Sequence, residues 1–243
     1  MTRAVRLGLI YPEGGGEYEY YQFAETLDWR MQPLVLAAHL AGGDENHQPA
    51  ALRETGSLRR LEYSARRLAH LKPDVALWAC TSGSFIVGRK GAEAQVAAIA
   101  AICDCPSSST SLAFVAALRH LGVTRVGVLA SYIEETSRAF VSFLGEHGVD
   151  IAGFEWHGAP GGNDAYEMPV ELFLRSARAI DGPKVDAFLI PDTAIAGFPI
   201  LRTLEAELSK PVLAANQVTL WEGLRLAGWR EAVPGFGRLM ERF

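Results

Sequence analysis

The sequence predicts an α/β protein made of two pseudo-symmetric, doubly wound lobes, each with a parallel sheet flanked by helices. Three observations predict this fold. Short β-rich apolar segments recur in the same order in the two halves of the chain, segments with helical periodicity separate them, and no flexible linker interrupts the 243 residues. Strands that alternate with helices form parallel sheets joined by right-handed crossovers.

Four landmarks carry the internal repeat. They pair the strand at residues 6–10 with that at 125–129, the strand at 74–78 with that at 186–190, the segment at 105–108 with that at 210–213, and the helix at 111–122 with that at 219–228. Each half therefore opens on a strand and closes on a helix. We expect a first lobe at residues 1–110, a second lobe at 111–217, and a C-terminal segment, 218–243, that returns to the first lobe.

Helical periodicity lies between the landmarks. Residues 58–69 carry one apolar stripe opposite a basic face, formed by Leu58, Leu61, Ala65, Leu68 and Ala69. Ser131 and Glu134 have the spacing of a capping box, which predicts a helix from there to about residues 145–148. Pro199 suits the first turn of another helix, which carries Leu201, Leu204 and Leu208.

Composition and charge exclude several classes of protein. The net charge is −5, from 23 Lys and Arg against 28 Asp and Glu, without a basic patch for nucleic acid. The most apolar stretch, residues 94–103, is interrupted by Gln95 and is too short for a membrane span. The N-terminus runs into a strand without a signal-peptide core, so we expect a cytoplasmic protein. Its three cysteines, an odd number, predict reduced thiols and no metal site.

Cys80 and Asp192 hold matching positions in the two halves, each just after a strand. Ligands bind beyond the carboxyl ends of parallel strands, so a thiol and a carboxylate there indicate two reagents facing one substrate. The hydroxyls of Thr81 and Ser82 and the nearby backbone N–H groups are suited to holding a carboxylate. Alternative interpretations are a structural buried thiol at Cys80 and a helix N-cap or turn residue at Asp192.

The chemistry expected of such a pair is proton transfer at a carbon next to a carboxylate, which needs no cofactor. Burial would raise the pKa of Asp192, and hydrogen bonding or a helix N-terminus would lower that of Cys80. A thiolate could instead add to an activated double bond and let it rotate before it leaves. Tyr132, at the end of a strand, is a further candidate donor, or else a packing aromatic with a solvated hydroxyl.

Three loops are expected near this site. Residues 14–16, three glycines in a row, lack the spacing of a dinucleotide fingerprint and have no clear helix after them, so they predict a loop beside the site. Residues 42–51 and 158–166 are expected to shape the pocket. The six histidines share no motif.

The chain resembles the aspartate/glutamate racemase superfamily, and within it the branch of maleate cis-trans isomerases and arylmalonate decarboxylases. The resemblance is carried by residues 80–82, 121–128, 211–221 and 234–239. It implies two Rossmann-like lobes, an active site in the cleft between them and cofactor-independent chemistry. It also implies that Cys80 is the catalytic cysteine of the first half, with Thr81, Ser82 and Tyr132 as carboxylate donors. We further expect Pro12 and Thr193 to contact the substrate.

The chain departs from that family at three positions. Racemases and maleate isomerases carry a second cysteine where this chain has Asp192. Arylmalonate decarboxylases carry their catalytic cysteine there and have glycine in place of Cys80. The segment after the first strand, residues 11–15, lacks the asparagine of the isomerase pattern. A mechanism with two thiols is therefore excluded, and Asp192 would serve as the second acid or base.

We therefore expect an isomerase or racemase of a small carboxylic acid, with Cys80 as base or nucleophile and Asp192 as its partner on the opposite face. One alternative is a decarboxylase of a malonate-type acid, in which Cys80 protonates the product. Another is a non-catalytic protein that binds carboxylates. No nucleic acid, membrane or cofactor is expected, and association into a homo-oligomer is left open.

Overall fold

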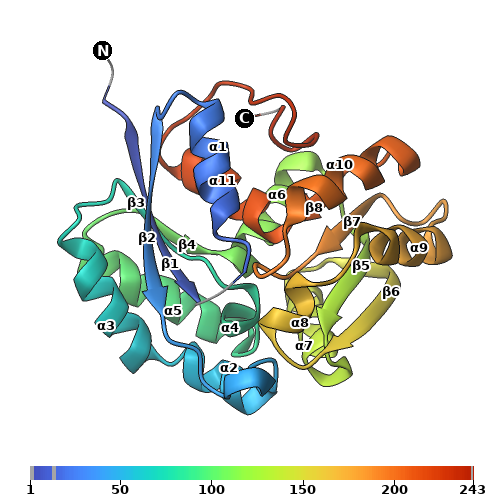
Figure 1. The fold of residues 1–243 in the computed structure, drawn as a ribbon, viewed down its shortest axis with the longest axis horizontal. Coiled ribbons are helices and arrows are strands. Elements are labelled where there is room, and N and C mark those ends of the chain that lie inside the picture. The colour runs from blue at the N-terminus through green and yellow to red at the C-terminus, as the bar shows by residue number, and fades with distance from the viewer. Residues whose placement is uncertain (1–2, 13–14, 242) are drawn as a thin grey trace.

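Two four-stranded parallel sheets form the centres of two lobes that lie side by side (Figure 1). The computed structural model describes residues 3–12, 15–241 and 243. The first sheet has the order β2-β1-β3-β4 and the second the order β6-β5-β7-β8. The strands are β1 (Val5–Pro12), β2 (Met31–Ala38), β3 (Val75–Trp78), β4 (Ser107–Ser109), β5 (Arg125–Tyr132), β6 (Asp150–Ala159), β7 (Ala187–Ile190) and β8 (Val212–Ala214). The predicted fold class is confirmed.

The two sheets have equivalent strand orders, so the segments that repeat in the sequence occupy the same positions in the two sheets. β1 and β5 are the strands that open the halves, and β3 and β7 are the strands that precede Cys80 and Asp192. β4 and β8 match the third landmark. The outer strands β2 and β6 were not predicted, and each pairs with the opening strand of its lobe.

Helices cover both faces of each sheet (Figure 1). They are α1 (Tyr18–Thr26), α2 (Pro49–Thr55), α3 (Leu58–Ala69), α4 (Thr81–Phe85), α5 (Gly88–Cys103), α6 (Thr110–Leu121), α7 (Glu134–Glu146), α8 (Gly162–Tyr166), α9 (Val170–Ile180), α10 (Gly197–Leu208) and α11 (Ala215–Leu226), with a 3₁₀ turn at Gly43–Glu45. α1 follows the glycine loop, where no helix was clearly expected.

The predicted helices are confirmed, with two corrections. In α3 the apolar stripe is buried at its centre, whereas Leu58 at its start is 45% exposed and Ala69 at its end is partly exposed. The predicted capping box is wrong, because Ser131 belongs to β5 and α7 begins at Glu134 without a side-chain cap. The hydroxyl of Ser131 instead donates to Asp192. The Ser131 hydroxyl therefore makes a tertiary hydrogen bond and does not cap the helix that follows.

α11 follows β8 of the second sheet but packs against the first sheet. At Gly223 a Cβ atom would lie 2.4 Å from Cδ1 of Leu7 and 2.9 Å from Cδ1 of Leu77, so the absence of a side chain permits the close approach. The crossover begins at Ala215, three residues before the predicted segment. The proposed lobe boundaries remain a prediction.

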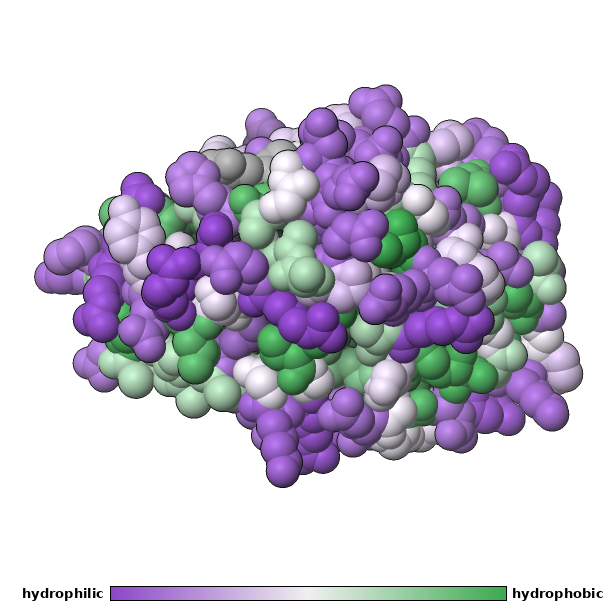
Figure 2. All heavy atoms as spheres, turned by 90° about the horizontal axis from the view of Figure 1, so that it is seen from below, coloured by the Kyte–Doolittle hydropathy of each residue, from purple (hydrophilic) through white to green (hydrophobic). Residues whose placement is uncertain are grey.

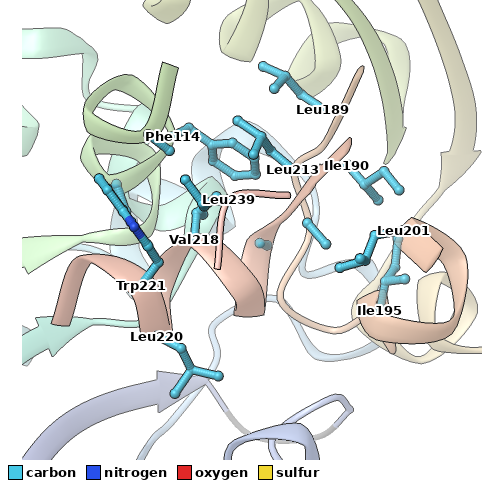
Figure 3. Packing of buried hydrophobic residues seen from close by; sticks show 14 of the residues in the cluster. Phe114, Leu189, Ile190, Ile195, Leu201, Leu213, Val218, Leu220, Trp221 and Leu239 are labelled. Carbon is cyan, nitrogen blue, oxygen red and sulfur yellow. The ribbon is translucent and has the colours of Figure 1, made fainter. Parts of the chain in front are cut away.

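The hydrophobic core continues from one lobe into the other. Figure 3 shows side chains of α6, α10, α11, β7 and β8 in one cluster, among them Phe114, Leu189, Leu201, Leu213 and Trp221. Figure 2 shows a face on which hydrophilic side chains predominate and hydrophobic ones form small separate groups. No helix in the described part of the chain is long and apolar enough to cross a membrane.

Candidate active site

Cys80 lies at the junction between β3 and α4. Its backbone is extended, with φ −144° and ψ 117°, and it caps α4: Sγ accepts a 3.3 Å hydrogen bond from the Gly83 N–H. The hydroxyl of Ser82 lies 3.8 Å from the same sulfur. A strand that ends on small polar residues thus places the thiol at the carboxyl edge of the sheet, surrounded by donors.

At neutral pH the side chain of Cys80 is a protonated thiol. Burial raises the pKa of Cys80 to about 12, and the negative charge of Asp192 adds to the rise. Hydrogen bonds from Gly83 and Ser82 act in the opposite direction but are outweighed. Hydrogen bonding thus acts on this pKa in the expected direction, but the net shift is upward, because the cost of desolvating a thiolate dominates.

Asp192 follows β7 as Cys80 follows β3, and both of its carboxylate oxygens are engaged. Oδ1 accepts a 2.9 Å hydrogen bond from the Ala194 N–H, and Oδ2 accepts a hydrogen bond from the Ser131 hydroxyl. Asp192 thus forms a turn and is not the N-cap of α10, which begins at Gly197. Its side chain is 5% exposed.

The thiol and the carboxylate line the same cavity, which has a volume of about 30 Å³. This is room for about one water molecule. Both lobes contribute to the wall, which is formed by Tyr11, Pro12, Leu40, Asn46, His47, Leu52, Cys80, Ser82, Gly162, Asp192, Thr193 and Ala194. The structure therefore brings the two predicted reagents together in one small cavity.

The other predicted site residues fall into two groups. Pro12, Ser82 and Thr193 line the cavity. Thr81 is fully buried beside it, and its hydroxyl makes no hydrogen bond within the described part of the chain. Tyr132 does not line the cavity, since its hydroxyl donates to the carbonyl of Pro191. Whether these residues bind substrate stays a prediction.

His47 is a site residue that the sequence did not reveal. Its Nε2 lies 3.7 Å from Oδ2 of Asp192, and its Nδ1 lies 3.1 Å from the carbonyl oxygen of Ala159. A lone histidine in a loop carries no motif, and only the tertiary fold places it against Asp192. The one available signal was its place within residues 42–51, the segment expected to shape the pocket.

The loops expected near the site do reach it. Residues 42–51 supply Asn46 and His47, and residues 158–166 supply Gly162, whose N–H donates to Oδ1 of Asn46 at 3.1 Å. In the glycine loop, Gly16 lies against the carbonyl of Thr193. Glu13 and Gly14 of that loop lie outside the described residues.

A larger hollow, of about 640 Å³, lies at the outer edge of the first lobe. β2 and α3 line it, with Arg59, Tyr63 and Arg67 among the residues. It contains none of the predicted reagents, so we assign the chemistry to the smaller cavity. No group of three or more His, Cys, Asp or Glu side chains in the described ranges could hold a metal ion.

The comparison with known sequences gives a family and two relatives. A family model described as arylmalonate decarboxylase matches residues 54–240. The arylmalonate decarboxylase of Bordetella bronchiseptica is 29% identical over 182 residues, which cover 73% of this chain and 75% of the relative. The maleate isomerase of Nocardia farcinica is 28% identical over 251 aligned residues, covering 98% of this chain and 96% of the relative.

Solved structures share the two-lobed fold. The maleate isomerase of Pseudomonas putida S16, solved with maleate, has a TM-score of 0.91 at 17% identity and covers 99% of this chain and 98% of that one. A mutant of the Nocardia farcinica enzyme, with a covalently bound succinylcysteine intermediate, has a TM-score of 0.87 at 22% identity, with 98% of each chain covered.

Proposed function

The chain belongs to the arylmalonate decarboxylase family, and we propose that it is a cofactor-independent isomerase or racemase of a small carboxylic acid. It acts at the carbon next to the carboxylate. Cys80 is the nucleophile or acid–base group on one face of that carbon, and Asp192 is the acid–base group on the other. The single observation that carries this proposal is that the two side chains, from equivalent strand ends of the two lobes, line one cavity.

The groups around the cavity favour an acid that is held by hydrogen bonds. Among the described residues that line it, none is Lys or Arg. A substrate carboxylate would be bound instead by the hydroxyls of Ser82 and Thr81, of which the latter is buried without a partner. Such fixed donors also stabilise the negative charge that spreads onto the carboxylate when the neighbouring carbon loses its proton.

The size of the cavity indicates that the site opens to admit its substrate. About 30 Å³ cannot hold a carboxylic acid of several carbon atoms. The wall is shared between the lobes, so a change in their separation or in the loops at residues 42–51 and 158–166 would enlarge it. Closure over the bound acid would then exclude water from the reacting carbon.

Both chemical routes expected from the sequence suit the pair. A thiolate at Cys80 would add to the double bond of an unsaturated acid, as the succinylcysteine of the Nocardia farcinica enzyme indicates for that protein. In a saturated acid, one group would take the α-proton and the other would return a proton to the opposite face. Both routes need an enediolate-like intermediate, and neither needs a cofactor.

Decarboxylation is the second candidate, and the apolar side of the cavity favours it. Pro12, Leu40, Leu52 and Ala194 line the site together with the reagents. A second carboxylate of a malonate-type acid would lose hydration against this wall without gaining a cation, which promotes loss of carbon dioxide. Cys80 would then protonate the resulting carbanion.

The experiment is a turnover assay in D2O followed by ¹H NMR. The substrates are maleate, phenylmalonate and the separate enantiomers of aspartate and glutamate. We expect interconversion of isomers or enantiomers, with a loss of 10³-fold or more in Cys80→Ser and none in Cys105→Ser, which changes a thiol outside the site. Release of carbon dioxide would support the second candidate. Full activity of Cys80→Ser would overturn both.

A further inference from the structure

His47 comes from the first lobe, but the second lobe holds it. Its backbone N–H donates to the carbonyl of Pro160 at 2.9 Å, and its own carbonyl accepts from the Thr136 hydroxyl at 2.7 Å. The ring packs edge-on against Tyr132, with 4.8 Å between centroids. The side chain is 5% exposed. The ring orientation is therefore fixed only when the two lobes are together.

The contacts of the two ring nitrogens assign the tautomer. Nδ1 lies 3.1 Å from the carbonyl oxygen of Ala159. Because a carbonyl oxygen only accepts hydrogen bonds, we assign a proton to Nδ1. Nε2, on the opposite side of the ring, is directed at Oδ2 of Asp192 at 3.7 Å. That separation exceeds a hydrogen bond, and a movement of about 1 Å would form one.

Nε2 is the place in this pair where a proton can be kept. Both oxygens of Asp192 already accept hydrogen bonds, from Ala194 and from Ser131. Each oxygen keeps one further lone pair, through which Oδ2 can receive a proton without losing its donor. In the described part of the chain no donor contacts Nε2 of His47, so its lone pair can take that proton on from Oδ2 while both existing bonds stay in place.

The site needs such an acceptor because its nucleophile starts as a thiol. The titratable groups that line the cavity in the described part of the chain are Tyr11, His47, Cys80 and Asp192. Tyr11 is unsuitable as a base, because burial raises its pKa well above the usual value and its hydroxyl donates to Thr193 at 2.7 Å. This leaves Asp192 and His47 to receive the proton of Cys80.

We propose that His47 and Asp192 act as one unit that accepts and returns a single proton in each turnover. Asp192 meets the substrate or the thiol, and His47 shares the proton through Nε2. His47 thus acts through Asp192 and is a positioning residue. This inference rests on the proposed function and adds to it the identity of the proton store.

The steps balance without any further reactant. With an unsaturated acid, the S–H bond of Cys80 breaks, its proton goes to the pair, and the sulfur lone pair forms the C–S bond while the π electrons move into the carboxylate as an enediolate. After rotation the C–S bond breaks and the thiolate takes the proton back. With a saturated acid, the pair takes the α-proton while the C–H electrons move into the carboxylate as an enediolate, and Cys80 gives its own proton to the opposite face of the carbon. The pair then returns its proton to the Cys80 thiolate, which restores the resting protein.

A measurement without substrate tests the pair directly. In protein labelled with ¹⁵N-histidine, the ring signals of His47 are identified by their loss in His47→Gln. We expect Nδ1 to be protonated in both the wild type and Asp192→Asn, and the Nε2 signal to differ between them at neutral pH. Groups facing the ring in the structure are Asp192 and Tyr132. Identical His47 ring signals in the two proteins from pH 5 to pH 9 would overturn the proposal, whatever the substrate is.

Turnover gives the second test, using the acid that wild-type protein converts. We expect His47→Gln to lower kcat by about 100-fold with KM changed less than about threefold. Imidazole in the buffer should restore part of the activity of His47→Ala, which a merely structural role would not produce. His70→Gln, an exposed histidine, is the matched control. An unchanged kcat in His47→Gln would refute the proposal that His47 and Asp192 share a proton. The activity of Cys80→Ser tests the proposed function separately.

Discussion

Glu19 on α1 and Asn216 at the start of α11 are joined by a 2.9 Å hydrogen bond, although 197 positions separate them in the sequence. The same Nδ2 of Asn216 lies 3.2 Å from the carbonyl oxygen of Thr193, beside Asp192. The other oxygen of Glu19 accepts a 2.7 Å hydrogen bond from the N–H of Phe198 on α10. This buried carboxyl therefore links a first-lobe helix to the second-lobe segment that carries the candidate site.

Glu19 should make the stability of the protein depend on pH. Burial raises its pKa from 4.5 to about 7, and the hydrogen bonds from Phe198 and Asn216 oppose the rise. Between these two pH values the Glu19 carboxyl is protonated in the folded protein but ionised in the unfolded chain. The contribution of Glu19 to the free energy of unfolding is therefore fully present below about pH 4.5 and is lost as pH rises through about 7.

The expected size follows from the shift. From pH 5 to pH 8 the free energy of unfolding should fall by about 2 kcal/mol more in the wild type than in Glu19→Gln. Urea denaturation at the two pH values measures it. Glu25→Gln changes an exposed carboxyl of the same helix and should follow the wild type. Parallel pH profiles for wild type and Glu19→Gln would show that Glu19 does not titrate as described.

Cys80 should react slowly with iodoacetamide in the folded protein. In a Cys103→Ser/Cys105→Ser background, a pKa of about 12 makes the thiolate about 1000-fold scarcer at pH 8 than at the ordinary value of 9.0. The rate should rise about tenfold per pH unit, and Asp192→Asn should raise it because the charge of Asp192 disfavours the thiolate. Mass spectrometry of the labelled peptide follows the reaction. A rate equal to that in urea would contradict the burial of the thiol.

Ser131→Ala should weaken both stability and turnover. It removes the hydroxyl that donates to Oδ2 of Asp192 and leaves a buried charged oxygen without that partner. We expect the free energy of unfolding to fall by about 1–3 kcal/mol. Ser137→Ala also removes a buried hydroxyl, but one that donates at 3.0 Å to a backbone carbonyl, that of Tyr132. Calorimetry measures the free energy of unfolding of both variants. A smaller decrease for Ser131→Ala than for Ser137→Ala would contradict the hydrogen bond between Ser131 and Asp192.

Two helical glycines test the packing of α11 on the first lobe. Gly223→Ala places a methyl group 2.4 Å from Leu7 and should destabilise by about 1–3 kcal/mol. Gly145→Ala, on α7, has no heavy atom within 4 Å of the new Cβ apart from its chain neighbours and its own helix backbone, and should stabilise by about 0.5 kcal/mol through its helix propensity. Chemical denaturation compares them. Equal effects would show that α11 is not packed as closely as described.

Local patterns were enough to predict the parts of the fold that repeat. β1, β3, β5 and β7 are short apolar strands with buried residues on both faces, so each is visible as a continuous hydrophobic run. The outer strands β2 and β6 have mixed burial, with exposed positions such as Gln32 and Asp150. The sequence of β6 carries no comparable run, whereas β2 has one at residues 34–38, which was missed because it forms no part of the repeat.

The candidate site was predictable only where the repeat marked it. Cys80 and Asp192 were found because they occupy equivalent strand ends. His47 was missed because its partners, Ala159 and Asp192, are more than one hundred residues away. Ser131 was misread as a helix cap because its local spacing fits a cap, whereas its hydroxyl serves Asp192.

The most direct test is a crystal structure of Cys80→Ser with the bound acid that wild-type protein converts. The account predicts that the side chain at position 80 and the carboxylate of Asp192 approach opposite faces of the carbon next to the substrate carboxylate, each at about 3.5 Å. An acid with both groups on the same face, or one bound in the hollow beside α3 and away from Cys80, would contradict it.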